Sequence, residues 1–305
     1  MIQELKKLTS IDFPFKNDNE FKIYLEEINT IGYNNKVLEK DFYLTALLWI
    51  IGIQIPEIVF KWWTCLNKIH FPYFRLSEDL DFSLPIENHW ESKRKQIAHY
   101  IDEKINTISK ILWWQLEKYH GSVQSSDLLK NKKYTYLKYT LWYKSIFGWD
   151  DSIKIEVTYT PKQYIPSLMM PIQHIYKNLV YETNIFPENR ILCLDIEEMI
   201  AEKTRAALTR YVPVIRDFYD LRYLSEKWYN IMEYIPLIKY KCIESKNHRS
   251  IDTFIHPDNP DKTLDTLSYL STRITLDLYP VLQPWSGFDL NKIYIIIKNI
   301  HKIII

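Results

Sequence analysis

Apolar residues recur at helical spacing in two long segments of the chain. Over residues 39–51 they are Phe42, Leu44, Leu47, Leu48 and Ile51, and over residues 90–119 they are Ile97, Ile101, Ile105, Ile108, Ile111 and Leu112. Side chains three or four residues apart lie on one face of a helix, so each segment predicts an amphipathic helix. Both apolar stripes are more typical of a packed core than of a binding face.

Alternating apolar and polar residues predict strands in the intervals between these helices. The predicted strands are Ile58–Lys61, a segment around residues 75–82, Tyr134–Tyr143 and Ile153–Thr160. Successive side chains of a strand point to opposite faces of a sheet. Leu80 and Phe82 therefore share one face while Asp79 and Asp81 share the other, and Glu156 lies on the polar face of the last strand.

The pattern changes after residue 160. Residues 161–190 contain four prolines and no clear period, which is typical of a connection between domains. Asp195 followed by Glu198 predicts a capping box at the start of a helix that runs to Arg210, and the remaining chain alternates helical stretches with polar loops. We therefore predict an α+β protein with a mixed sheet and flanking helices over residues 1–165 and a helical domain over residues 190–305.

Composition excludes several classes of protein. Lys and Arg (39) nearly balance Asp and Glu (38) in the 305 residues, so any nucleic-acid contact must come from a local patch. Only five glycines occur, which leaves no place for a glycine-rich phosphate loop of the Walker or dinucleotide type.

The cysteines and the apolar runs bear on where the protein acts. Cys65, Cys193 and Cys242 are far apart and form no Cys-x-x-Cys spacing, which predicts a reducing compartment and no structural zinc. The most apolar run, Leu44–Phe60, is interrupted by polar residues and is too short to predict a membrane span. We expect a cytoplasmic protein with no membrane contact.

The three carboxylates suggest a chemistry. Asp79, Asp81 and Glu156 lie on predicted neighbouring strands, and carboxylate oxygens are the ligands that Mg²⁺ prefers. Such a set can hold two magnesium ions about 4 Å apart, as in enzymes that transfer nucleotides. A solvated acidic strand face is the alternative for the Asp-x-Asp pair alone. Thr64 is expected to cap a helix that follows Lys61, at a position suited to phosphate.

Two motifs resemble one known family. The first is Phe60-Lys61-x-x-Thr64-Cys65-Leu66-x-Lys68 followed by Arg75-x-Ser77-Glu78-Asp79-x-Asp81-Phe82. The second is Glu197-Glu198-x-x-Ala201-Glu202-Lys203-x-x-Ala206-Ala207-Leu208-x-Arg210 followed by Arg216-Asp217-x-x-Asp220-Leu221. Together they are similar to the motifs of the AbiEii/AbiGii-type nucleotidyltransferase toxins, members of the DNA polymerase β superfamily. The resemblance implies a polymerase-β-like nucleotidyltransferase core.

The resemblance also implies roles for individual residues. Asp79 and Asp81 would be catalytic metal ligands, with Glu156 as the third carboxylate of the metal site. Lys203 would meet the triphosphate, and Asp217 would be a further catalytic acid. The nucleotide pocket would be formed by Thr64, Lys68, Arg75, Ser77 and Lys203. An ordinary ion pair between two helices is the alternative for Lys203 and Asp217.

One departure from the family leaves the activity open. Relatives carry two small residues where this chain has Trp62-Trp63, and small residues there let the backbone approach phosphate closely. Two indole rings would fill that space. The chain is therefore either an active transferase or a relative whose nucleotide site is blocked.

The family resemblance finally implies partners. These are a nucleoside triphosphate, an RNA acceptor such as transfer RNA, and a cognate antitoxin protein. Lysines interleaved with tyrosines offer a local patch for RNA, namely Lys130, Lys132, Lys133, Lys138, Tyr134, Tyr136 and Tyr139. A solvated strand with core tyrosines is an equal alternative for this patch, and transfer to a protein hydroxyl is an alternative to transfer to RNA.

Overall fold

The computed structural model describes residues 2–85, 90–112, 114–122, 132–160, 163–210, 212–244, 260–283 and 287–304. The chain forms two compact units, which are considered separately. The first is built from the described residues before 123 and from residues 132–194, and the second from those that follow Leu194.

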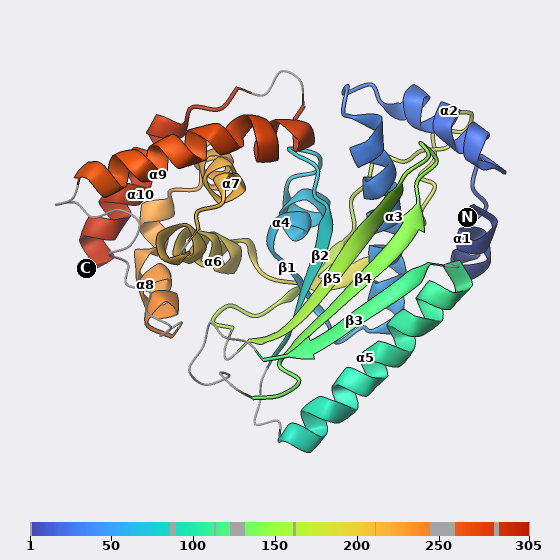
Figure 1. The fold of residues 1–305 in the computed structure, drawn as a ribbon, viewed down its shortest axis with the longest axis horizontal. Coiled ribbons are helices and arrows are strands. Elements are labelled where there is room, and N and C mark those ends of the chain that lie inside the picture. Colours follow the sequence, from blue (N-terminus) through green and yellow to red (C-terminus); the bar gives the residue numbers. More distant parts are fainter. Residues whose placement is uncertain are drawn as a thin grey trace. The chain divides into compact units, whose positions relative to one another are not determined.

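A seven-stranded mixed sheet forms the centre of the first unit (Figure 1). Its strand order is β3-β4-β5-β2-β1-β7-β6, with parallel pairing between β2 and β5 and between β1 and β7 and antiparallel pairing elsewhere. The strands are β1 (Val59–Lys61), β2 (Asp79–Pro85), β3 (Gln115–Gly121), β4 (Tyr136–Lys144), β5 (Asp150–Thr160), β6 (Leu168–Pro171) and β7 (Arg190–Cys193). The strands predicted from alternation correspond to β1, β2, β4 and β5.

Helices α3 and α5 cover one face of this sheet. The Tyr43 ring of α3 lies 5.0 Å from the Tyr143 ring of β4, and the Tyr139 hydroxyl of β4 donates a 2.9 Å hydrogen bond to Asp102 of α5. Odd-numbered residues of β4 and β5 are therefore buried under helices, and even-numbered residues face the other side. The helical elements of this unit are α1 (Ile2–Thr9), α2 (Asp18–Ile28), α3 (Asn35–Gln54), α4 (Trp62–Cys65), the π-helix η1 (Leu66–His70) and α5 (Glu91–Leu112).

The structure corrects one predicted helix. The stripe predicted over residues 90–119 ends at Leu112, because β3 begins at Gln115 and pairs along its whole length with β4. Seven consecutive residues of β3 find strand partners, from Gln115 opposite Trp142 to Gly121 opposite Tyr136. Sheet pairing of this extent overrides a weak local preference for helix.

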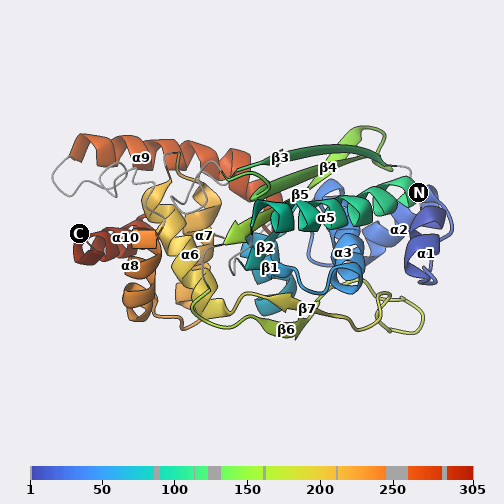
Figure 2. The ribbon, with the colours of Figure 1, turned by 90° about the horizontal axis from the view of Figure 1, so that it is seen from below.

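The segment predicted as a connection also carries structure. Strands β6 and β7 pair with each other, and β7 joins β1, so this segment extends the sheet of the first unit to Cys193 (Figure 2). Pro171 ends β6 at the edge of the sheet, where a missing N–H is tolerated, and Pro166 and Pro187 lie outside the strands. Pro161 lies outside the described residues.

The described part of the second unit is helical. Asp195 caps α6 by accepting a hydrogen bond from the Glu197 backbone N–H, so the predicted helix start is confirmed. Glu198, however, binds Lys241 of α8 at 2.6 Å instead of completing a capping box. The elements are α6 (Ile196–Thr209), α7 (Ile215–Glu226), the 3-10 helix η2 (Ile231–Tyr234), α8 (Ile235–Glu244), α9 (Pro260–Arg273), the π-helix η4 (Ile274–Leu278), the 3-10 helix η5 (Tyr279–Val281) and α10 (Leu290–Ile304).

The predicted fold class is confirmed: a mixed sheet with flanking helices is followed by a helical unit. In the part of the chain that the structure describes, no helix combines the length and the apolar character needed to cross a membrane.

Candidate active site

A row of charged residues crosses four neighbouring strands. Lys61 of β1 is the register partner of Asp81 of β2, Asp81 is the partner of Glu156 of β5, and Glu156 is the partner of Lys138 of β4. Register partners in a sheet point to the same face. The row thus reads cation, anion, anion, cation across the sheet, on the face opposite α3 and α5.

Asp79 adds a third carboxylate to this face, because it lies two residues before Asp81 on the same strand. Its register partner on β5 is Lys154. Carboxylates without soft ligands suit a hard divalent cation such as Mg²⁺, which binds oxygen and completes its octahedron with water and phosphate. Asp79, Asp81 and Glu156 therefore share one face of the sheet, as expected, and their role as metal ligands stays a prediction.

Tyr136 lies beside these carboxylates. Burial raises the pKa of its hydroxyl well above the usual value, and the negative charges of Glu156 and Asp81 and a hydrogen bond to Glu156 raise the pKa further. The hydroxyl therefore stays protonated and can donate to Glu156. Its place in the sequence, two residues before Lys138 on β4, is the signal that connects it with this row.

Lys61 is a further residue of the charged row, and the sequence alone assigned it no role. Its side chain is buried, and its ammonium donates a 2.6 Å hydrogen bond to the Thr158 hydroxyl of β5. The ammonium also lies 4.6 Å from the centroid of the Trp62 ring. The sequence signal for this residue is a lysine at the end of an apolar strand. Burying a cation is costly unless it has a partner, so such a lysine is expected to have one.

The start of β2 is held by hydroxyl groups. Thr64 was predicted to cap a helix, but α4 already begins at Trp62, so Thr64 lies inside this short helix. Its hydroxyl donates to the backbone carbonyl of Asp79 and lies 2.7 Å from the Ser77 hydroxyl. Thr64 and Ser77 are thus buried residues that position Asp79, and the predicted cap is wrong.

The two tryptophans do not simply fill a cavity. Trp62 and Trp63 are both half-buried, and the Trp63 ring stacks 5.0 Å from the guanidinium of Arg75. Arg75 is fully buried and donates a 3.0 Å hydrogen bond to the Leu76 carbonyl. Trp62 has a φ of 62°, in the left-handed region that glycine adopts without strain. The backbone here keeps a shape suited to glycine although the residue is tryptophan.

This conformation leads to a prediction for Trp62. Left-handed backbone costs a residue with a Cβ about 1–2 kcal/mol. Trp62→Gly and Trp62→Ala both remove the ring, but only glycine also removes the strain. We expect the glycine variant to unfold with a free energy about 1 kcal/mol higher than the alanine variant, measured by urea denaturation.

Trp63 is the matched control for this comparison. It follows Trp62 within α4, where glycine is about 1 kcal/mol less favourable than alanine. Of the variants Trp63→Gly and Trp63→Ala, the alanine variant should therefore have the higher free energy of unfolding, the reverse of the order at Trp62. The same order at both positions would contradict the left-handed conformation of Trp62.

Lys68 was predicted to bind nucleotide, and its surroundings do not fit that role. Its side chain is fully buried, and its ammonium donates hydrogen bonds to Asp41 (2.7 Å), Thr45 (2.9 Å) and Tyr73 (2.9 Å). These three bonds use all the hydrogens of the ammonium. The Asp41 carboxylate also accepts from the Tyr176 hydroxyl at 2.7 Å. Lys68 therefore belongs to a closed network between α3, η1 and the segment around Tyr176.

His174 lies against this network and gives a pH-dependent prediction. Burial, together with the positive charge of Lys68, lowers the pKa of His174 from 6.5 to about 4. The unfolded chain therefore binds a proton near pH 6.5 that the folded chain binds only near pH 4. Stability supplied by the neutral imidazole is complete above pH 6.5 and is lost as the pH falls towards 4.

We expect His174→Gln to reduce this acid sensitivity. Between pH 7.5 and pH 4.5 the wild-type chain should lose up to about 3 kcal/mol more unfolding free energy than the variant, by urea denaturation at each pH. The exposed His99 of α5 is the matched control, and His99→Gln should behave as the wild type. Equal pH profiles for wild type and His174→Gln would contradict the prediction.

The predicted site residues of the second unit form ion pairs that join α6 and its C-terminal end to α7. Lys203 binds Asp220 at 2.9 Å, and Arg210 binds Asp217 at 3.4 Å. Lys203 and Asp217 thus each form an ion pair with another residue of the same motif. All four belong to the second motif, which therefore holds these two helices together.

The lysine and tyrosine patch proposed for RNA is changed by the fold. Tyr139 is buried and faces Asp102, so it cannot stack on a base, and Lys138 belongs to the charged row beside Glu156. Lys132 and Lys133 are exposed. Lys130 lies outside the described residues.

A mixed sheet with carboxylates on adjacent strands, followed by a helical unit, is the arrangement that the resemblance predicts. The family model described as "Nucleotidyl transferase AbiEii toxin, Type IV TA system" matches residues 54–280. The chain therefore belongs to the AbiEii nucleotidyltransferase toxin family. The match includes both motifs on which the resemblance was based.

Among solved structures, MenT4, a nucleotidyltransferase toxin from Mycobacterium tuberculosis, is similar to this chain. It is 14% identical, with a TM-score of 0.49, and the match covers 95% of this chain and 99% of that chain. A search of curated proteins gave no match.

Proposed function

We propose that this toxin transfers a nucleotide from a nucleoside triphosphate to an RNA acceptor, such as the acceptor end of transfer RNA, with Mg²⁺ bound by Asp79, Asp81 and Glu156. The observation that carries this proposal is the pairing of Asp81 with Glu156 on adjacent parallel strands. Nucleotides and transfer RNA are cytoplasmic, which is where we propose that the protein acts. Membership of a type IV system also implies a cognate antitoxin.

The chain's own residues divide the work between them. Asp79 and Asp81 hold negative charge at the start of β2, where the Thr64 hydroxyl fixes the Asp79 backbone. Tyr136 donates to Glu156 and so holds its carboxylate in place. Lys61 and Lys138 flank the carboxylates and reduce the repulsion between them. Bound magnesium would supply the positive charge that activates the attacking hydroxyl and stabilises the leaving pyrophosphate.

Lys203 and Asp217 complete the proposal from the second motif. We propose that Lys203 binds the triphosphate as a point charge and that Asp217 is a further catalytic acid. Their ion pairs with Asp220 and Arg210 would fix the positions of both side chains. Lys203→Gln should therefore raise the KM for the nucleotide.

The test is incubation of the purified chain with each of the four ribonucleoside triphosphates, labelled on the α-phosphate, together with Mg²⁺ and total transfer RNA. The proposal expects label in RNA, dependent on Mg²⁺ and absent with Asp79→Asn. Label that appears only in protein would favour the alternative of protein modification. Absence of label from both acceptors, with a folded chain, would contradict the proposed activity.

A further inference from the structure

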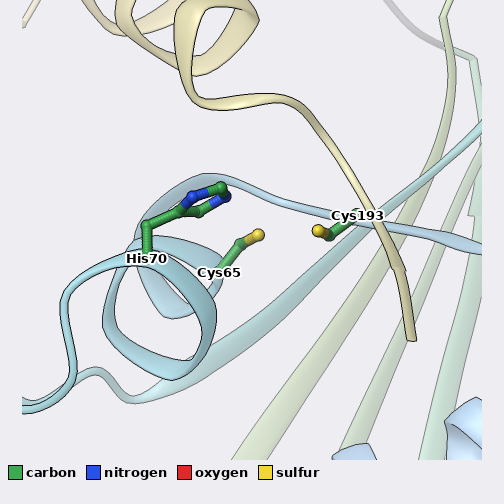
Figure 3. A group of neighbouring side chains, drawn as sticks. All are labelled: Cys65, His70 and Cys193. Carbon is green, nitrogen blue, oxygen red and sulfur yellow. The ribbon is translucent and has the colours of Figure 1, made fainter. Parts of the chain in front are cut away.

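Two cysteines and a histidine that are distant in the sequence lie together in the first unit (Figure 3). The Sγ atoms of Cys65 and Cys193 and a ring nitrogen of His70 all lie within 4.8 Å of one another. Cys65 ends α4, His70 ends η1, and Cys193 ends β7. Both cysteines are buried and His70 is half-buried, and neither cysteine forms a disulfide.

The sheet explains how the two cysteines meet. Phe60 of β1 is the parallel register partner of Cys193, and the Leu194 backbone N–H donates a 3.0 Å hydrogen bond to the Phe60 carbonyl. The chain turns directly from β1 into α4, which brings Cys65 back over the end of β7. The sequence predicted no structural zinc because it contains no Cys-x-x-Cys spacing, but this strand pairing supplies the proximity that spacing did not.

The π-helix explains how His70 joins them. In an α-helix, residues five apart are turned about 140° from each other, so Cys65 and His70 would point in different directions. The Phe71 N–H instead bonds to the Leu66 carbonyl at 2.7 Å, five residues back, which widens the turn. Cys65 and His70 then lie nearly above one another. Single π-turns are rare in proteins, and those that do occur are frequently found at functional sites.

The chemistry of the three groups suits a thiophilic metal. Two thiolates and an imidazole are typical ligands of zinc, with Zn–S near 2.3 Å and Zn–N near 2.0–2.1 Å in protein sites. Such bonds place ligand atoms about 3.5–3.8 Å apart in a tetrahedron, so atoms that lie within 4.8 Å of one another need to approach by about 1.3 Å at most. Neither a carboxylate nor a second histidine belongs to the cluster, which makes a hard cation such as Mg²⁺ a poor fit.

A backbone carbonyl orients the imidazole. His70 Nε2 lies 3.3 Å from the Leu194 carbonyl oxygen. A carbonyl only accepts, so this contact is a hydrogen bond in the tautomer with the proton on Nε2, and that tautomer leaves a lone pair on Nδ1. Histidines that bind metals commonly donate their other ring N–H to a carbonyl or carboxylate in this way.

We propose that Cys65, His70 and Cys193 bind a zinc ion that ties the segment of residues 62–70 to the end of β7. This segment contains Trp62, Trp63 and Thr64, and Thr64 holds the backbone of Asp79. The ion would therefore stiffen the support of the candidate active site without taking part in the reaction. The site is separate from the proposed magnesium site and does not depend on the proposed function.

The test measures metal content of the full chain purified from cells grown with zinc, without a metal-affinity tag and under reducing conditions. Elemental analysis should give one zinc per chain. Cobalt substitution should give the visible absorption of tetrahedral cobalt and the near-ultraviolet band of thiolate-to-cobalt charge transfer. A wild-type chain with neither zinc nor these bands would overturn the proposal.

Variants locate the ion. Cys65→Ser, Cys193→Ser and His70→Gln should each weaken zinc binding by more than about a hundredfold, since the loss of an outer partner alone costs 10- to 100-fold. Cys242→Ser, which changes the buried cysteine of the second unit, is the matched control and should retain zinc. His70→Gln is the substitution expected to leave folding intact, because His70 is only half-buried. Zinc retained in folded His70→Gln and lost in Cys242→Ser would place the ion elsewhere and overturn the proposal.

Discussion

Asp81→Asn should lower the rate of nucleotide transfer about a thousandfold. Asp81 is almost fully buried at the centre of the charged row, between Lys61 and Glu156, and the amide removes a negative charge without changing its shape. Loss of one preorganised electrostatic contact in an active site costs about 10²–10³-fold, and loss of a metal ligand belongs at the upper end. The corresponding barrier increase is about 4 kcal/mol. The measurement is the initial rate of label incorporation at saturating nucleotide.

The matched control is Asp150→Asn on β5. Asp150 is exposed at the start of the same strand that carries Glu156, so its amide should leave transfer unchanged. Growth arrest in a host expressing the chain should be relieved by Asp81→Asn and not by the control. If folded Asp81→Asn transfers nucleotide at the wild-type rate, the carboxylate row is not the active site.

Lys68→Met should lower the free energy of unfolding by about 3–5 kcal/mol. The substitution leaves the Asp41 carboxylate fully buried without its cation, and removing one partner of a buried ion pair costs this much. Burial lowers the pKa of Lys68, although the negative charge of Asp41 and the hydrogen bond to it favour the charged ammonium. The lowered pKa therefore indicates how strongly the site is removed from water. Urea denaturation of the wild-type chain and the variant gives the difference directly.

Two controls separate this structural role from nucleotide binding. Lys6→Met removes an exposed pair with Asp12 and should change stability by less than about 0.5 kcal/mol. The double variant Lys68→Met, Asp41→Leu removes both charges and should recover much of the lost stability. A Lys68→Met chain of wild-type stability with a raised KM for nucleotide would show instead that Lys68 binds the triphosphate.

The sequence predicted the elements whose local pattern is strong. The apolar stripe of α3, the alternation of β5 and the Asp195 cap of α6 each depend on neighbouring residues, and all three are found in the structure. The common face of Asp79 and Asp81 follows from the two-residue period of a strand. Glu156 could be placed on a polar face, but its pairing with Asp81 depends on the register between β2 and β5.

Contacts between distant segments account for what the sequence did not predict. Lys68 resembles a phosphate-binding lysine until its partner Asp41, 27 residues earlier, is seen beside it. Strand β3 depends on pairing with β4, which no local pattern encodes. The left-handed backbone of Trp62 is unexpected for a bulky residue, and the approach of Cys65 to Cys193 requires both the sheet order and the π-helix. These features depend on tertiary structure.

The measurement that tests the account most directly is calorimetric titration of the chain with each ribonucleoside triphosphate in Mg²⁺. The wild-type chain is compared with the double variant Asp79→Asn, Asp81→Asn. We expect at least one nucleotide to bind the wild-type chain in a Mg²⁺-dependent manner and none to bind the folded double variant. Equal binding by both would contradict the assignment of the carboxylates, and no binding by the wild type until Trp62→Gly and Trp63→Gly are introduced would show that the two indoles block the site.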